Sequence, residues 1–118
     1  MKYDLEERLI KFASSIIEFT DAMPAGRASN HMAGQLLRSG TAPALIYGEA
    51  QAAESRNDFL HKMKVCLKEL RETSISLRII EHRKISKVGD LPVLLRENIE
   101  LIAIFVKSIK TASGSKDS

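Results

Sequence analysis

The chain contains no tryptophan, and aromatic residues make up only 5% of its 118 residues. A core with so few rings must be filled mainly by aliphatic side chains, as is usual where helices pack on helices. Its single cysteine, Cys66, excludes an intramolecular disulfide, and no cysteine cluster offers a zinc site. The sequence therefore indicates an aliphatic core that is held together without cross-links.

Long apolar runs are absent as well. The N-terminus passes at once into a charged amphipathic segment and lacks the apolar stretch of a signal peptide. No run approaches the roughly 18 apolar residues that would indicate a membrane span. We therefore expect a protein of the reducing cytoplasm with no membrane partner. The net charge of +3 permits contact with a polyanion but is weak evidence for it.

No group of catalytic or cofactor-binding residues stands out either. The three histidines lack the pairing or the nearby carboxylate spacing of a helical zinc or di-iron site. Cys66 falls at a predicted core position and has no helix N-terminus to activate it. The glycines match neither phosphate-binding fingerprint. We expect a protein that is not an enzyme, with no metal, no cofactor and no small-molecule substrate.

What the sequence does have is helical periodicity. In the first segment Leu5, Leu9, Phe12, Ile16 and Phe19 recur at helical spacing behind a capping Asp4. In the second segment Pro43 predicts either a kink or a break into two shorter helices. The four segments predicted to be helical are residues 4–22, 29–53, 57–82 and 91–111.

Short connections between long helices favour antiparallel neighbours. The predicted fold class is therefore all-α, an antiparallel up-and-down four-helix bundle over residues 1–112. Asp90 is expected to cap the fourth helix. Residues 113–118 are polar and are expected to form a disordered tail.

Apolar residues on two of the helices exceed what a monomer needs. On the fourth helix they cover roughly 160°, at about 100° of rotation per residue, whereas packing on one side of a bundle needs a stripe of about 100°. Surplus apolar surface usually marks an interface. We expect self-association through Ile10, Ile17 and Ile104, which lie furthest from the stripes that face their own core.

The third helix carries a second, basic stripe. Lys64, Lys68, Arg71 and Arg78 fall within roughly 80° of one another, about 120° from the centre of the buried face. Such a stripe could follow a phosphate backbone. It could equally be a solvated face whose charges are balanced by acidic neighbours such as Glu69 and Glu72. Both interpretations remain open at this point.

Several stretches of the sequence resemble one bacterial family. They are residues 34–41 (GQLLRSGT), 47–55 (YGEAQAAES), 57–59 (NDF) and 67–72 (LKELRE), with shorter matches at 4–10 and 101–104. In these stretches the chain is similar to the four helix bundle proteins, also called 23S rRNA intervening-sequence proteins.

The resemblance implies an antiparallel four-helix bundle that assembles as a homopentamer. It also implies a gene that lies within an inserted segment of a large-subunit ribosomal RNA gene or stands free elsewhere in the genome. The family's RNA-related role, with ribosomal or other structured RNA as the partner, is inferred mainly from that gene location. A related pentameric bundle serves as an accessory factor of retroelement reverse transcriptases. The main hypothesis is RNA or ribonucleoprotein binding through the basic stripe. The alternative is a protein-interaction scaffold or a mobile-element accessory factor that does not bind RNA.

The sequence departs from the family at one position. The family has an asparagine shortly before its acidic residue, where this chain has Ile46 before Glu49. The remaining polar residues of the motif predict an interhelical polar network, in which Arg38 and Glu49 would satisfy one another. The network comprises Gln35, Arg38, Ser39 and Glu49.

Overall fold

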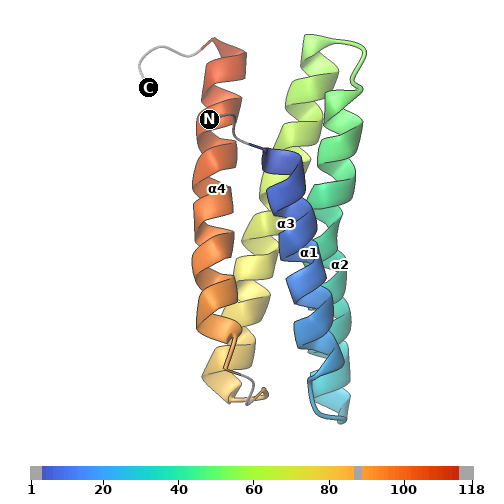
Figure 1. The fold of residues 1–118 in the computed structure, drawn as a ribbon, viewed down its shortest axis with the longest axis vertical. Coiled ribbons are helices and arrows are strands. Elements are labelled where there is room, and N and C mark those ends of the chain that lie inside the picture. The colour runs from blue at the N-terminus through green and yellow to red at the C-terminus, as the bar shows by residue number, and fades with distance from the viewer. Residues whose placement is uncertain (1–3, 87–88, 115–118) are drawn as a thin grey trace.

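The computed structural model describes residues 4–86 and 89–114, which form four helices (Figure 1). No strand occurs within these two ranges. Successive helices run antiparallel and pack on one another, and the contact between the last helix and the first is the weakest of the four. The up-and-down bundle predicted from the sequence is confirmed. The helices are α1 (Leu5–Asp21), α2 (Arg27–Gln51), α3 (Arg56–Arg83) and α4 (Leu91–Ser113).

The helix ends follow local chemistry. The Asp4 carboxylate accepts a hydrogen bond from the Glu7 backbone N–H at 3.1 Å, and the Ser55 hydroxyl accepts one from Asp58 at 3.0 Å. The predicted Asp90 cap is wrong in one respect, because Asp90 precedes α4 but its side chain makes no capping hydrogen bond. Ser113, which we assigned to the tail, ends α4 instead, and residues 115–118 lie outside the described chain.

The core is aliphatic with a few rings, as the composition required. The edge of the Tyr47 ring meets Phe105 with the ring centroids 6.0 Å apart. Helix α2 contributes few large side chains to this core, and small residues take their place. The largest fully buried apolar residues are Leu9, Ile16, Phe19, Leu36, Met63, Leu70, Leu77, Ile80, Leu101 and Phe105.

Gly40 is the point of closest approach between α1 and α2. A Cβ atom at Gly40 would lie 2.9 Å from both Cγ1 and Cγ2 of Ile16, which is fully buried. Contacts this short force a neighbour to move, and a buried β-branched side chain has little freedom to do so. Gly34 and Gly48 differ, because a Cβ there would meet nothing within 4 Å.

We therefore expect Gly40→Ala to lower the free energy of unfolding by about 1–3 kcal/mol through overpacking. Gly34→Ala and Gly48→Ala are matched controls on the same helix and should be neutral or stabilising by up to about 1 kcal/mol. Urea denaturation of the three variants measures the difference. An equal response at all three positions would contradict the close packing at Gly40.

Pro43 lies inside α2, which continues through it from Arg27 to Gln51. The alternative of two shorter helices is therefore wrong. The Pro43 ring is buried, and the Pro43 carbonyl accepts a hydrogen bond from the Cys66 thiol at 3.6 Å. Because proline has no N–H, the Ser39 carbonyl one turn earlier loses its usual helical donor.

We expect Pro43→Ala to raise the free energy of unfolding by about 1 kcal/mol. Restoring the helical donor relieves up to about 3 kcal/mol, and loss of the buried ring atoms offsets about 2 kcal/mol of that gain. Urea denaturation and helical circular dichroism measure the change. A loss of about 2 kcal/mol or more would show that α2 depends on proline at this position.

Candidate functional site

The basic residues predicted on the third helix all lie on the outer face of α3. Lys64, Lys68, Arg71 and Arg78 are exposed, which confirms their predicted orientation. We call these four residues the basic ridge. His61 and His82, on the same helix, are exposed as well. The cause is the helical period, which places the buried Cys66, Leu70 and Leu77 on the opposite side of α3.

The acidic residues expected to balance the ridge have another partner. Arg38 on α2 donates through Nη1 to Glu69 at 2.9 Å and through Nη2 to Glu72 at 2.6 Å. These hydrogen bonds, first to Glu72 and then to Glu69, raise the pKa of the Arg38 guanidinium above its ordinary value. The Glu69 side chain is nearly buried, so a partner is required there.

Most of the positive charge on the ridge is therefore left unbalanced. Lys68 Nζ lies 3.9 Å from Glu69 Oε2, at the limit of an ion pair. Within residues 4–86 and 89–114, Lys64, Arg71 and Arg78 form no ion pair. The interpretation of a ridge neutralised by Glu69 and Glu72 fails at these three positions.

The predicted pairing of Arg38 with Glu49 is wrong. Both residues lie on the single continuous α2, about three turns and 16 Å apart along its axis. Glu49 faces Lys62 instead, with Oε1 and Nζ 3.7 Å apart. Arg38 does form the interhelical contact that the motif suggested, but its partners are on α3.

The other two residues of the predicted network have different surroundings. Ser39 is buried, and its hydroxyl lies 2.9 Å from the hydroxyl of Thr73, which also donates to the Glu69 carbonyl at 2.9 Å. Gln35 is exposed. Sequence reasoning missed Thr73, because a threonine inside a helix gives no signal until its neighbour across the interface is known.

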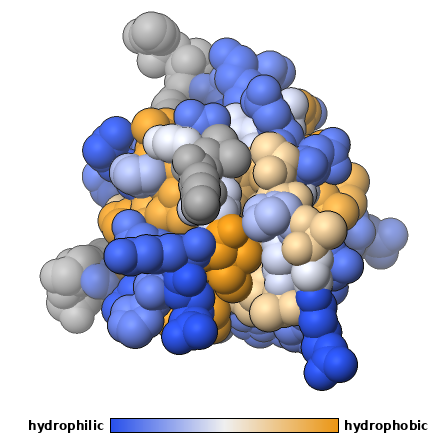
Figure 2. Space-filling view, turned by 90° about the horizontal axis from the view of Figure 1, so that it is seen from below, coloured by the Kyte–Doolittle hydropathy of each residue, from blue (hydrophilic) through white to orange (hydrophobic). Residues whose placement is uncertain are grey.

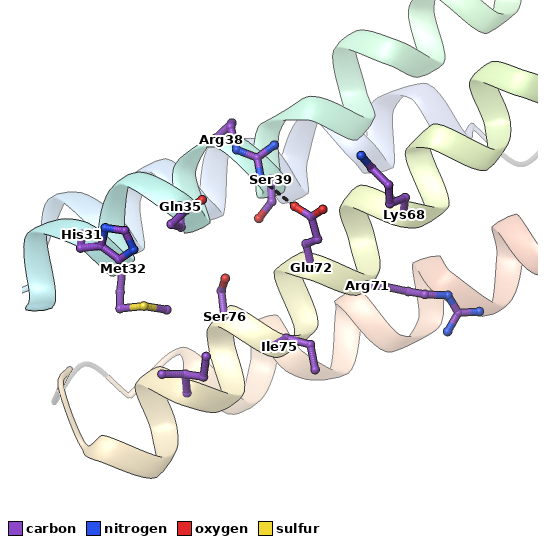
Figure 3. A pocket seen from close by; sticks show the side chains of 11 residues that line it. His31, Met32, Gln35, Arg38, Ser39, Lys68, Arg71, Glu72, Ile75 and Ser76 are labelled. Atoms are coloured by element: carbon purple, nitrogen blue, oxygen red, sulfur yellow. Dashed lines mark hydrogen bonds and ion pairs between the residues drawn. The ribbon is translucent and has the colours of Figure 1, made fainter.

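A groove of about 500 Å³ runs between α2 and α3, where these polar residues and part of the ridge meet (Figure 3). Met32, Ile75 and Ile79 supply its apolar lining. In Figure 3 the Lys68 side chain extends toward α2, and Arg71 lines the groove from α3 as well. Ile75 is 53% exposed and lies among the ridge cations, a position that its helical angle already indicates. We call this feature the α2–α3 groove.

The predicted interface residues differ in exposure. Ile10 and Ile17 are 47% and 45% exposed, two turns apart on the same side of α1. Ile104 is partly buried against the core and shares a shallow hollow with Phe59. It therefore does not lie furthest from its own core, because a neighbouring helix covers that flank of α4.

Other large apolar side chains are more exposed than Ile104. On α4 they are Val93 and Ile99, and on α2 they are Leu37 and Leu45. Figure 2 looks at the end of the bundle where the α1–α2 and α3–α4 connections lie, and shows apolar residues reaching the surface between polar ones. Surplus apolar surface is thus present, but it is distributed differently from the prediction.

Cys66 is fully buried, as predicted for a core position, and burial raises the pKa of its thiol to about 12 from the ordinary 9.0. At neutral pH the thiol is therefore neutral and shielded, which does not suit a nucleophile. Within the ranges that the structure describes, no group of three or more His, Cys, Asp or Glu residues is placed to hold a metal ion. Over the same ranges, no helix combines the length and apolarity that crossing a bilayer requires.

This raised pKa gives a pH-dependent prediction. Because the folded protein holds the thiol proton more tightly, the stabilisation is complete below about pH 9 and is lost between about pH 9 and 12. We expect the free energy of unfolding of the wild type to fall over this window more steeply than that of Cys66→Ala. Urea denaturation at several pH values compares the two proteins. Parallel curves would contradict the assignment.

Comparison with known proteins supplies structural relatives but no match to a family model or to a curated protein. A solved structure from Bacteroides thetaiotaomicron, described as a protein with unknown function from the S23 ribosomal protein family, superposes with a TM-score of 0.80 at 25% identity. The match covers 91% of this chain and 99% of that one. This relative shares the whole bundle, and its description names a ribosomal protein family rather than an enzyme family.

Proposed function

We propose that this chain is a non-catalytic, self-associating bundle that binds structured RNA through the basic ridge. The observation that carries the proposal is that Lys64, Arg71 and Arg78 are exposed and form no ion pair within the residues that the structure describes. Glu69 and Glu72, the two carboxylates expected to balance the ridge, form hydrogen bonds with Arg38 instead. Three uncompensated cations on one exposed helix face attract phosphate groups and release counterions when they bind them.

The geometry of the ridge suits a phosphate backbone. From Lys64 to Arg78 the ridge extends over about 21 Å at the rise of an α-helix, a distance that spans several phosphate groups. No aromatic side chain interrupts the four cations in the sequence. Binding by base stacking is therefore not supported. A surface of this kind recognises the shape and charge of folded RNA rather than its sequence.

The comparisons lend the proposal further support. The structural relative is described as a member of a ribosomal protein family, and the motif around Arg38 and Glu69 resembles that of the 23S rRNA intervening-sequence proteins. Both point toward ribosomal RNA as the ligand to test first.

The direct experiment is equilibrium binding of the wild-type protein to a labelled, structured fragment of large-subunit ribosomal RNA. At about 50 mM salt phosphate contacts are strong, so binding should be detectable at micromolar protein or below. An unstructured RNA of the same length is the control for shape recognition. No detectable binding to the structured fragment under these conditions would contradict the proposal.

Self-association is supported by the exposed aliphatic side chains. Ile10 and Ile17 on α1 and Ile75 and Ile79 on α3 are large apolar side chains that the isolated bundle leaves exposed, and such surface usually marks an interface. Sedimentation equilibrium at micromolar concentration should show a species several times heavier than the chain of 13.1 kDa. A monomer at that concentration would contradict this part of the proposal.

A protein-interaction scaffold is the second candidate function. The observation that favours it is the apolar lining of the α2–α3 groove, where Ile75 and Ile79 are exposed. Exposed aliphatic side chains gain little from a phosphate backbone but suit a helix packed into a groove. This candidate predicts that loss of the ridge charges leaves the physiological complex intact.

A further inference from the structure

The α2–α3 groove is a concave surface formed by side chains of both helices. Met32 on α2 and Ile75 and Ile79 on α3 supply its apolar lining, and charged side chains such as Arg71 and Glu72 line it as well (Figure 3). Lys68 on α3 and His31 on α2 stand at its margins. A helix that filled this groove would need apolar residues along its centre and acidic residues beside them.

The outer face of α1 has this pattern. Ile10 and Ile17 are exposed, two turns apart. Glu6, one turn before Ile10, and Asp21, one turn after Ile17, lie within about 40° of the two isoleucines at 100° per residue. Both acids are exposed, and in the described part of the chain neither forms an ion pair. We call Glu6, Ile10, Ile17 and Asp21 the α1 stripe.

We propose that the α1 stripe of one copy docks into the α2–α3 groove of the next copy. Ile10 and Ile17 cover the apolar lining, while Glu6 and Asp21 meet its margins, where Lys68 supplies a positive charge and His31 a ring N–H donor. This inference rests on the self-association in the proposed function and identifies the two surfaces that perform it. The occupant is therefore a second copy of this chain.

The placement of the two surfaces is consistent with a closed assembly. One is a convex helix face on α1 and the other a groove between α2 and α3, so the contact is head-to-tail, with a different face used on each side. The two surfaces lie on adjacent sides of the bundle, because α2 borders both. A head-to-tail contact closes into a ring when the rotation between successive copies allows it, and otherwise continues as a filament.

This docking leaves the outer part of the basic ridge free. Lys64 and Arg78 do not line the groove, whereas Lys68 and Arg71 do. Because Ile75 lies among the ridge cations and Lys68 lines the groove, docking and RNA binding use neighbouring parts of α3 and are measured in separate experiments. Each can be tested without the other.

A charge exchange tests the docking. The groove variant carries His31→Glu and Lys68→Glu, and the stripe variant carries Glu6→Lys and Asp21→Lys. Each alone places like charges across the contact and should weaken self-association about tenfold or more. The chain that carries all four changes has opposite charges again and should recover assembly to within about threefold of the wild type. Sedimentation velocity over a concentration series measures all four proteins.

Two single variants test whether assembly depends on the groove itself or on any exposed apolar side chain. Ile75→Glu places a carboxylate in the groove and should disrupt assembly. Ile99→Glu, at a comparably exposed position on α4, lies outside both surfaces and should leave assembly unchanged. Circular dichroism confirms that each variant remains helical.

The outcomes distinguish this inference from the proposed function. A wild type that is monomeric overturns self-association itself and the docking with it. If the wild type assembles and its assembly is unchanged by Ile75→Glu and by the charge changes, only the docking is overturned. If Ile75→Glu weakens RNA binding and leaves assembly intact, the groove belongs to the RNA surface and the docking is wrong.

Discussion

Replacing Phe105 with alanine should lower the free energy of unfolding by about 3–5 kcal/mol. Phe105 is fully buried on α4, where its ring meets the edge of Tyr47 from α2. The substitution removes the largest apolar side chain from the middle of this helix and leaves a cavity that helices on three sides cannot close. Domains of this size are stable by about 5–15 kcal/mol, so the variant should be partly unfolded near physiological temperature. Urea denaturation followed by circular dichroism measures the loss.

Ile99→Ala is the matched control on the same helix. Ile99 is 58% exposed, so its truncation should change the free energy of unfolding by no more than about 0.5 kcal/mol. Measurement at low protein concentration keeps any interface from contributing. A loss at Phe105 no larger than at Ile99 would contradict the position of α4 in the bundle.

Neutralising the three unpaired ridge cations should weaken RNA binding on the order of 100-fold at low salt. The variant carries Lys64→Gln, Arg71→Gln and Arg78→Gln. Each cation lost removes one phosphate contact and the counterion release that accompanies it. All three side chains are exposed and make no ion pair among the described residues, so the fold should be unaffected. Fluorescence anisotropy with a structured ribosomal RNA fragment measures the affinity.

A triple variant on α4 controls for net charge. Arg96, Lys107 and Lys110 are also exposed, and replacing them with glutamine removes the same charge from a different face. Long-range electrostatic attraction between protein and RNA would fall equally in both variants. Direct phosphate contacts would be lost only in the ridge variant. An equal loss of affinity in the two variants would show that binding depends on net charge and not on the ridge.

The fold was predictable because the local signals agree. Leu5, Leu9, Phe12, Ile16 and Phe19 keep one helical stripe, and all five are buried. The outcome at Pro43 was not predictable, because its cost of roughly 3 kcal/mol can be absorbed when the rest of a long helix is packed on its neighbours. The presence of Pro43 in the sequence reveals this cost, but the sequence does not reveal the packing energy that offsets it.

The site was predictable only in part, for a related reason. Periodicity alone placed Lys64 and Arg71 on an outer face, because the outer face of a helix follows directly from the position of its own buried face. The partner of Arg38 depends on which helix lies opposite, and the register between α2 and α3 brings Glu69 and Glu72 to it. The exposure of Ile104 was mispredicted for the same reason, because a neighbouring helix covers the flank of α4 on which it lies.

The salt dependence of RNA binding tests the central claim most directly. If Lys64, Arg71 and Arg78 contact phosphates, a plot of the logarithm of the binding constant against that of the salt concentration should be steep for the wild type. The slope of the variant with all three replaced by glutamine should be shallower by roughly 2–3, from about 0.7–0.9 per phosphate contact. Equal slopes for the two proteins, or no binding by the wild type at about 50 mM salt, would contradict RNA recognition by the ridge.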